Sequence, residues 1–271
     1  QTICGTISSI HWQSYMVPAF CCSPLPDNCA EDDPLNPRMG AVEKAVLAVI
    51  AALVLLGLYL SYADPDYFRN HYTVEDGLLE WATVAALLIA MATCIRRLLR
   101  LRQVRKLRFH LMLCFLALVC LFGAGEEISW GQRLIGFDSP EYFAKHNTQQ
   151  EVGIHNLRID ISGRSIKLNK LIFGVGLGLG LFIYLFAMTP LYRKHPGFAD
   201  WLDSFAIPMP KNYQIISYLL LIAIVELLMD SSKRGEITEF AGSFVFMLNV
   251  AFPYNRQCFE NTTEEPPQQP S

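Results

Sequence analysis

The stretch FHLMLCFLALVCLFGAGEEI, residues 109–128, decides the fold of this chain. Seven basic side chains and no acid lie between Arg96 and Arg108, directly before it, and two adjacent glutamates stand at its end. Because a helix needs about 20 predominantly apolar residues to cross a bilayer, this stretch predicts a membrane-spanning helix.

Five further apolar stretches of similar character flank it on both sides. They cover approximately residues 41–62, 74–95, 168–191, 213–230 and 237–252. Hydrophobic residues make up 52% of the 271 positions and charged residues only 17%, which leaves too little polar surface to cover so many apolar helices in water. The sequence therefore predicts an all-α protein, a polytopic transmembrane helical bundle with about six spanning helices.

The two ends of the chain differ from this middle part. Residues 1–38 contain five prolines and four of the eight cysteines but no apolar run of spanning length, so we expect a disordered or non-native N-terminal extension. Residues 39–255 are expected to form the transmembrane domain. Residues 256–271 are expected to form a disordered C-terminal tail.

The basic run sets the expected orientation, because short loops rich in Lys and Arg stay on the cytoplasmic side. This places residues 96–108 and both termini on the cytoplasmic side of a cell (inner) membrane. The connections at 63–73, 136–167 and 231–235 are then on the outer side. Lys233 and Arg234 are then exceptions in a very short outer loop. We interpret the arginine run as a topology signal that faces lipid headgroups, and expect no nucleic-acid partner.

With this topology, acidic residues collect at the outer ends of four helices. They are Glu75 with Asp76 and Glu80, Glu126 with Glu127, Glu226 with Asp230, and Glu236 with Glu239. At 100° per residue, Asp76 shares a helix face with Glu80, and Glu126 shares one with Trp130 and Arg133. We therefore predict a shared acidic pocket at the outer face, in which Glu126 matters more than Glu127. The alternative is that the acids only mark helix ends, where they also suit the helix dipole.

The loop after the third helix carries further reactive side chains. Within FAKHNTQQEVGIHNL, residues 143–157, Glu151 and His155 stand four positions apart and would share one face of a helix. Such a pair suits an acid and a base or two metal ligands. An interfacial helix with a solvated polar face is the alternative.

These patterns assign an expected role to each candidate. The expected catalytic residues are Glu126, Glu151, His155 and Arg133; the expected metal ligands are Glu80, Glu126, Glu226 and Glu239; the expected substrate-binding residues are Asp76, Trp130, Gln132, Asn156 and Asp230. Oxygen ligands favour a hard divalent cation, so Mg, Mn or Ca is the expected cofactor.

Three strings, YTVEDGLLEW (72–81), GEEISWGQR (125–133) and QQEVGIHNL (149–157), resemble uncharacterised bacterial multi-pass inner-membrane proteins. The resemblance implies the layout of residues 39–252 and no particular activity.

Two function classes follow from the residues. The first is a metal-dependent enzyme that acts on a lipid-linked, headgroup or other small-molecule substrate at the outer leaflet, and the second is a proton- or cation-coupled transporter. A scaffold without chemistry is a third.

Overall fold

The computed structural model describes residues 39–154, 157–161, 164–168 and 174–260. The expected N-terminal extension, residues 1–38, lies outside the described residues, as do residues 261–271 of the expected tail.

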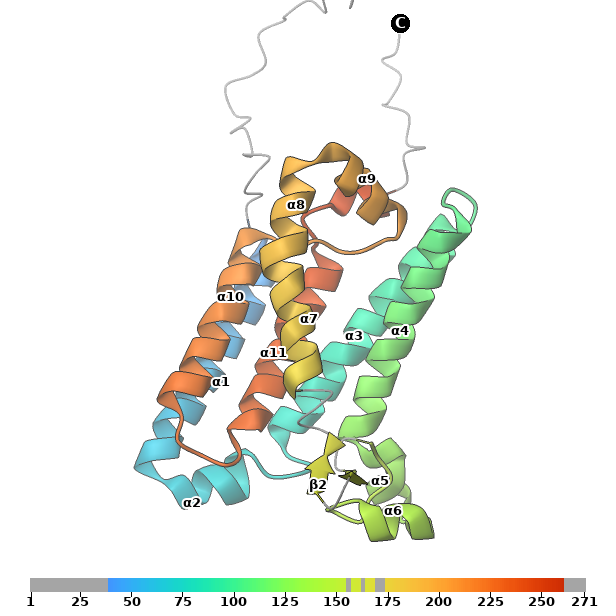
Figure 1. Ribbon diagram of the computed structural model, residues 1–271. Helices are drawn as coiled ribbons and strands as arrows, with labels where there is room; N and C mark the ends of the chain where they lie inside the picture. The colour runs from blue at the N-terminus through green and yellow to red at the C-terminus, as the bar shows by residue number, and fades with distance from the viewer. Residues whose placement is uncertain (1–38, 155–156, 162–163, 169–173, 261–271) are drawn as a thin grey trace, which may run out of the picture.

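Each of the six apolar stretches contains a helix (Figure 1). They are α1 (Ala41–Ala63), α3 (Leu78–Leu101), α4 (Leu107–Glu127), α7 (Leu177–Ile183) with η4 (Tyr184–Met188) and α8 (Thr189–Lys194), α10 (Asn212–Ala223) with η5 (Ile224–Leu228), and α11 (Arg234–Ala251). Four of these segments are long and apolar enough to cross a membrane: α1, α3, α4 and Gly174–Lys194. The apolar helix Asn212–Leu228 is shorter, and α11 begins with charged residues. The fold is a helical bundle with membrane-spanning helices, as predicted.

Short elements connect these helices. They are α2 (Pro65–Tyr67), η1 (Phe68–Tyr72), η2 (Ser129–Gly131), α5 (Gln132–Ile135), α6 (Glu141–His146), α9 (Pro196–Ser204) and η6 (Arg256–Phe259). A local addition to the helical fold is an antiparallel hairpin of β1 (Arg158–Ile161) and β2 (Arg164–Lys167), in which Arg158 lies opposite Lys167.

The bundle has two chemically different ends (Figure 1). The turn between α3 and α4, helix α9 and both ends of the described chain lie at one end, which we call the basic end because it carries the basic run 96–108. Helices α2, α5 and α6 and the hairpin lie at the other, which we call the acidic end. Successive long helices run in opposite directions, as the predicted alternation requires.

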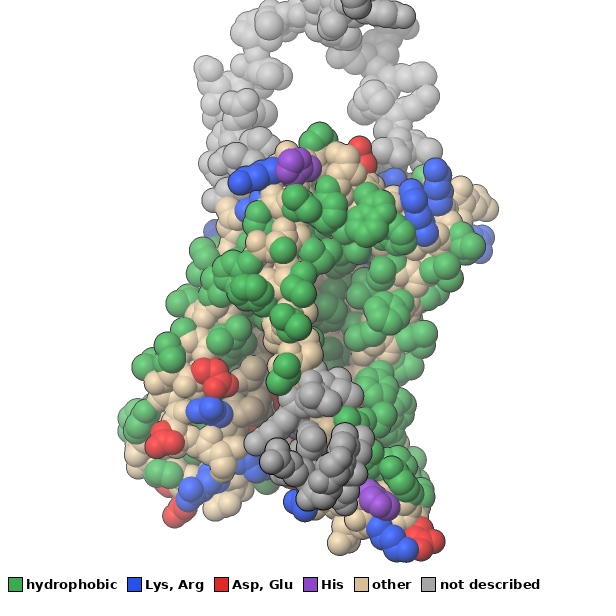
Figure 2. Space-filling model, viewed as in Figure 1, with side chains coloured by type: hydrophobic (Ala, Val, Ile, Leu, Met, Phe, Trp, Pro, Cys, Tyr) green, Lys and Arg blue, Asp and Glu red, His purple; other side chains and the backbone are tan. Residues whose placement is uncertain are grey.

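The core follows from small and apolar residues on three helices. Ala86, Ala90 and Cys94 of α3 are fully buried against Leu113 of α4 and Leu248 of α11, so these three helices approach closely. Large apolar side chains on the outer faces of the bundle stay exposed, among them Leu111, Phe115 and Leu118 of α4. Figure 2 shows such side chains along the middle of the bundle, with most charges toward its ends. This distribution suits a lipid surrounding.

The transmembrane domain reaches beyond its predicted end at residue 255. Element η6 buries Cys258 and Phe259, and the Phe259 ring packs on Phe109 and under the guanidinium of Arg97, 4.1 Å from the ring centroid. Residues 256–260 therefore belong to the bundle and not to a disordered tail, because the Phe259 ring packs against the apolar Phe109 and the cationic Arg97.

Candidate functional site

A sharp change of direction builds the acidic end. Helix α4 ends at Glu127, and Ser129, Trp130 and Gly131 follow with positive φ angles of 47°, 55° and 79°. Left-handed backbone is uncommon for residues other than glycine, and here two such residues occur in succession. The predicted helical face shared by Glu126, Trp130 and Arg133 is therefore wrong, because the helix stops before Trp130.

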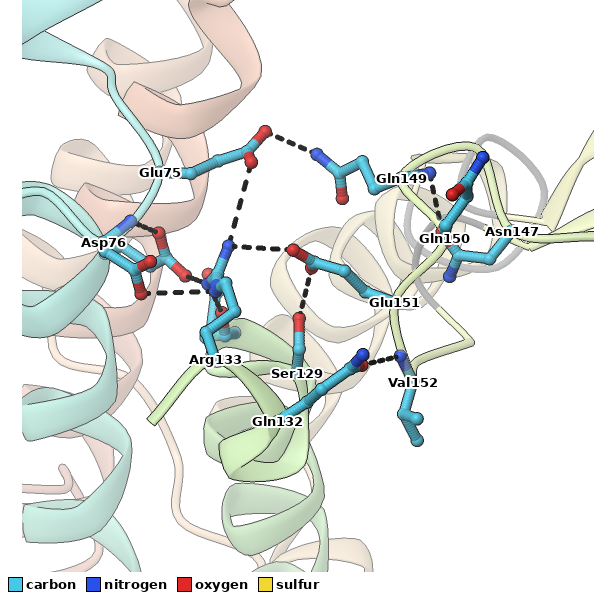
Figure 3. A network of polar contacts seen from close by, with 12 residues as sticks. Glu75, Asp76, Ser129, Gln132, Arg133, Asn147, Gln149, Gln150, Glu151 and Val152 are labelled. Atoms are coloured by element: carbon cyan, nitrogen blue, oxygen red, sulfur yellow. Dashed lines mark hydrogen bonds and ion pairs between the residues drawn. The ribbon is translucent and has the colours of Figure 1, made fainter. Parts of the chain in front are cut away.

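Arg133, on the short α5, is the centre of the polar network in Figure 3. Its side chain is 17% exposed, and its guanidinium reaches four carboxylates and one carbonyl. They are Glu80, in direct hydrogen bond; Asp76 at 3.2 Å; Glu151 at 3.6 Å; Glu75 at 3.7 Å; and the Glu127 backbone oxygen at 2.9 Å. Burial lowers the pKa of Arg133, but the carboxylates outweigh burial and raise it, so the guanidinium stays charged.

Asp76 belongs to this network through a turn and not through the helical face that periodicity predicted. It lies before α3 with a φ of 57°, and its backbone N–H donates to Glu80 Oε2. Gly77 is the N-cap residue of the helix, so the predicted common helical face of Asp76 and Glu80 does not exist. The two carboxylates meet because the turn folds Asp76 back over the first turn of α3.

A group of four carboxylates lies beside Arg133, and we call it the acid cluster: Glu80 of α3, Glu127 of α4, and Glu236 and Glu239 of α11. Glu127 and Glu239 each interact electrostatically with the other three members. Lys233 lies 3.7 Å from Glu236 and 3.5 Å from Glu75. Glu127 therefore belongs to the cluster, and the lesser role expected for it stays a prediction.

Glu126 has a different environment from Glu127. Its Oε1 accepts a 2.7 Å hydrogen bond from the Trp130 indole, and its Oε2 accepts one of 2.6 Å from the Ile154 backbone N–H. A Cβ on Gly153 would lie 3.3 Å from Glu126 Oε2, so the loop backbone passes very close to this carboxylate. Glu126 therefore holds the loop at residues 147–154 onto the end of α4, and the idea that it also faces Glu80, Glu226 and Glu239 stays a prediction.

The loop lies on the acidic end through side-chain contacts. Ser129 donates to Glu151, Gln149 donates to Glu75, and the Gln132 carbonyl accepts from Val152 N–H at 2.6 Å (Figure 3). Residues 147–154 form turns and bends, so the helical face expected for Glu151 is absent. His155 and Asn156, the expected base and substrate ligand, lie outside the described residues.

The four predicted metal ligands do not come together. Glu226 is half exposed and pairs with Arg234 at 2.8 Å, while Glu80 and Glu126 are engaged by Arg133 and by Trp130. Asp230 is exposed and lies beyond the end of η5. Within the described ranges, no three His, Cys, Asp or Glu side chains are gathered in a way that could hold a metal ion. We therefore assign no chemical step to a metal.

Several members of the network were missed in the sequence. Ser129, Gln149 and Lys233 had no predicted role, and Glu75 and Glu236 were predicted only as acids at helix ends. One signal was available: Lys233 is a cation on the acidic side, where the charge pattern of membrane loops disfavours it. A basic residue in that position is explained by the carboxylates it neutralises.

Chemically, the acid cluster is a set of like charges on three packed helices with two cations beside it. Carboxylates that interact electrostatically in this way repel one another when charged, so the group favours binding of a proton. Comparisons with protein families, with curated proteins and with solved structures give no match for this chain. The resemblance of its three polar strings to bacterial membrane proteins therefore stays a prediction.

Proposed function

We propose that this chain is a multi-pass protein of the cell (inner) membrane with its acidic end outside, and that the acid cluster carries out general acid–base chemistry on a lipid-linked or headgroup substrate at the outer leaflet. The observation that carries the proposal is the electrostatic interaction among four carboxylates from α3, α4 and α11, one of which, Glu80, pairs with Arg133. A carboxylate pair that shares a proton supplies both an acid and a base.

The roles follow from position. Glu127 and Glu239 interact with all other members of the cluster, so they are the candidates for proton exchange. Arg133 is a positioning residue, because it fixes Glu80 and brings Glu151 of the loop to the edge of the cluster. Glu126 positions the loop from the other side.

The packing favours an enzyme over the predicted transporter and over a scaffold. Helices α3, α4 and α11 share one buried core, so the carboxylates stand on a rigid support, as a catalytic site requires. Alternating access would require helices around the site to separate. A scaffold has no need for four acids near the membrane, where unpaired charges are costly.

The test is lipid mass spectrometry on proteoliposomes that contain the full chain and a total bacterial lipid extract. We expect the wild-type chain to convert at least one lipid species, Glu239→Gln to lose the conversion at least about tenfold, and Glu226→Gln to retain it. Glu226 is the matched control because its exposed ion pair with Arg234 lies apart from the cluster.

A proton-flux measurement on the same vesicles separates the two function classes. Proton flux that depends on Glu239, without a change in any lipid, would show that the chain is a proton carrier and not an enzyme. If the Glu239→Gln and wild-type chains convert the lipid equally well, the acid cluster takes no part in the reaction.

A further inference from the structure

The basic end carries a cavity that the proposed function does not use. It has a volume of about 360 Å³ and lies between the end of α3, the end of α11 and η6. Four arginines line it, Arg96, Arg97, Arg100 and Arg256, with Glu260 as the one acid among its lining residues. The cavity therefore has a strong positive charge and suits an anion.

The four arginines differ in what they already bind. Arg97 donates to the Val250 and Ala251 carbonyls at the end of α11 and stacks on Phe259, so it builds the wall. Arg256 pairs with Glu260 at 2.6 Å.

Arg96 and Arg100 lie one helical turn apart on α3 and are exposed. Within the part of the chain that the structure describes, neither guanidinium has a hydrogen bond or an ion pair. Their donors are therefore available to a ligand, and two guanidinium groups four residues apart can bind one phosphate from two sides.

A shallow apolar hollow, which we call the groove, lies beside the cavity on the outer face of α3, and all of its lining residues belong to that helix. Met91, Ala92, Ile95 and Leu99 line it, and Arg96 and Arg100 line both the groove and the cavity. Ile95 and Leu99 are 41% and 60% exposed, and the groove runs from the arginines toward the middle of the helix, where the bilayer interior would be. A charged end joined to an apolar track matches an amphiphile and not a free anion.

We infer that the cavity and the groove together bind an anionic phospholipid, with its phosphate between Arg96 and Arg100 and an acyl chain along Met91, Ile95 and Leu99. Basic pockets between helices at the cytoplasmic side are suited to such headgroups. The C-terminal residues 261–271 contain two glutamates but no large apolar side chain, so their composition matches the charge of the cavity and not the groove.

The experiment is native mass spectrometry of the full chain in detergent, titrated with phosphatidylglycerol, with phosphatidylcholine and with inorganic phosphate. We expect one phosphatidylglycerol to bind at least about tenfold more tightly than phosphatidylcholine. Arg96→Gln and Arg100→Gln should each weaken it by about tenfold, because each removes charge-assisted hydrogen bonds to phosphate. Arg102→Gln is the matched control, since Arg102 belongs to the same basic run but does not line the cavity, and it should change binding less than about twofold.

Two groove variants test the acyl chain. Ile95→Trp should fill the groove and weaken phosphatidylglycerol without affecting inorganic phosphate, whereas Ile89→Trp, on an exposed part of the same helix outside the groove, should do neither. Equal losses from Arg102→Gln and Arg96→Gln would overturn the site in favour of a diffuse surface charge. Inorganic phosphate that binds as tightly as the lipid, with no effect of Ile95→Trp, would also overturn it. Thermal unfolding of every variant confirms that the compared chains are folded.

Discussion

Arg133 joins three segments that are distant in the sequence. Its guanidinium contacts the turn before α3, the first turn of α3 and the loop at Glu151. Lysine has one compact ammonium and could not reach these acceptors together, so the planar guanidinium is what this position requires. The residue stabilises the acidic end by neutralising carboxylates that would otherwise repel one another.

Replacing Arg133 with Gln should lower the free energy of unfolding by about 3–5 kcal/mol, because it leaves the nearly buried Glu80 without its cation. Arg133→Lys should give a smaller loss, since the charge remains. Arg69→Gln is the control, because its ion pair with Asp66 is exposed and worth little. Chemical unfolding in detergent measures all three. A chain with Arg133→Gln that unfolds like wild type would show that the network contributes nothing to stability.

Trp130 supports a second prediction at this scale. Trp130→Phe keeps an aromatic ring against Phe122 but removes the indole N–H that donates to the buried Glu126. Losing one of the hydrogen bonds to a buried carboxylate should cost about 1–3 kcal/mol. It should also speed proteolysis of the loop at residues 147–154, which Glu126 holds through Ile154. Trp201→Phe, at an exposed position of α9, should change neither quantity.

The sequence predicted which acids collect at one end but not which of them face one another. Helix length and loop charge determine at which end the acids collect, and both can be read from the composition along the chain. Which acids face one another depends on the residue at which α4 ends. Glu126 reaches Trp130 and Ile154 because two non-glycine residues, Ser129 and Trp130, adopt left-handed backbone after α4. Only Gly131 marks this turn in the sequence, and one glycine does not fix its position.

At the scale of elements, α1 and α10 are joined at the basic end by a buried ion pair. Glu43 of α1 accepts from Lys211 at 2.8 Å and from the Tyr213 hydroxyl, and its other oxygen accepts from Gly40 N–H at 2.7 Å. Glu43 and Lys211 are 3% and 8% exposed. A buried charge is tolerated only when it is paired and hydrogen-bonded, so each partner requires the other.

Lys211→Met should therefore lower the free energy of unfolding by about 3–5 kcal/mol, because the Glu43 carboxylate stays buried without its cation. The double variant Glu43→Gln with Lys211→Met should recover most of that loss, since no unpaired charge remains. Lys44→Met, the exposed neighbour on the same helix, is the control. A double variant no more stable than Lys211→Met would show that the pair is not coupled.

The helices were predictable and the small elements were not, for a physical reason. A spanning helix is specified by the length of an apolar run, and this signal survives errors of several residues at each end. The hairpin β1–β2 and the element η6 are four residues per segment, and their placement depends on tertiary contacts such as Phe259 on Arg97. The ion pair of Glu43 with Lys211 likewise joins residues 168 positions apart, which no local pattern indicates.

At the scale of the whole molecule, the two ends carry opposite local chemistry. The basic end holds seven basic residues between positions 96 and 108, and the acidic end holds the acid cluster. The two cations that the loop rule places on the wrong side are both neutralised there, Lys233 by Glu75 and Glu236 and Arg234 by Glu226. These paired cations contribute little to the charge difference between the two ends, whereas Arg96 and Arg100 at the basic end have no hydrogen bond or ion pair within the described residues.

This imbalance predicts an orientation of the chain in the membrane, which can be measured in intact cells. Val104→Cys and Tyr142→Cys place exposed thiols at the basic and acidic ends. An impermeant maleimide should label Tyr142→Cys in intact cells and Val104→Cys only after permeabilisation, because moving a basic run across the membrane is costly. The parent chain, which has an exposed thiol at Cys114, gives the background. Labelling of Val104→Cys in intact cells, with Tyr142→Cys protected, would put the acid cluster in the cytoplasm. It would also move the proposed reaction to the inner leaflet, even though the electrostatic interactions among the carboxylates would be unchanged.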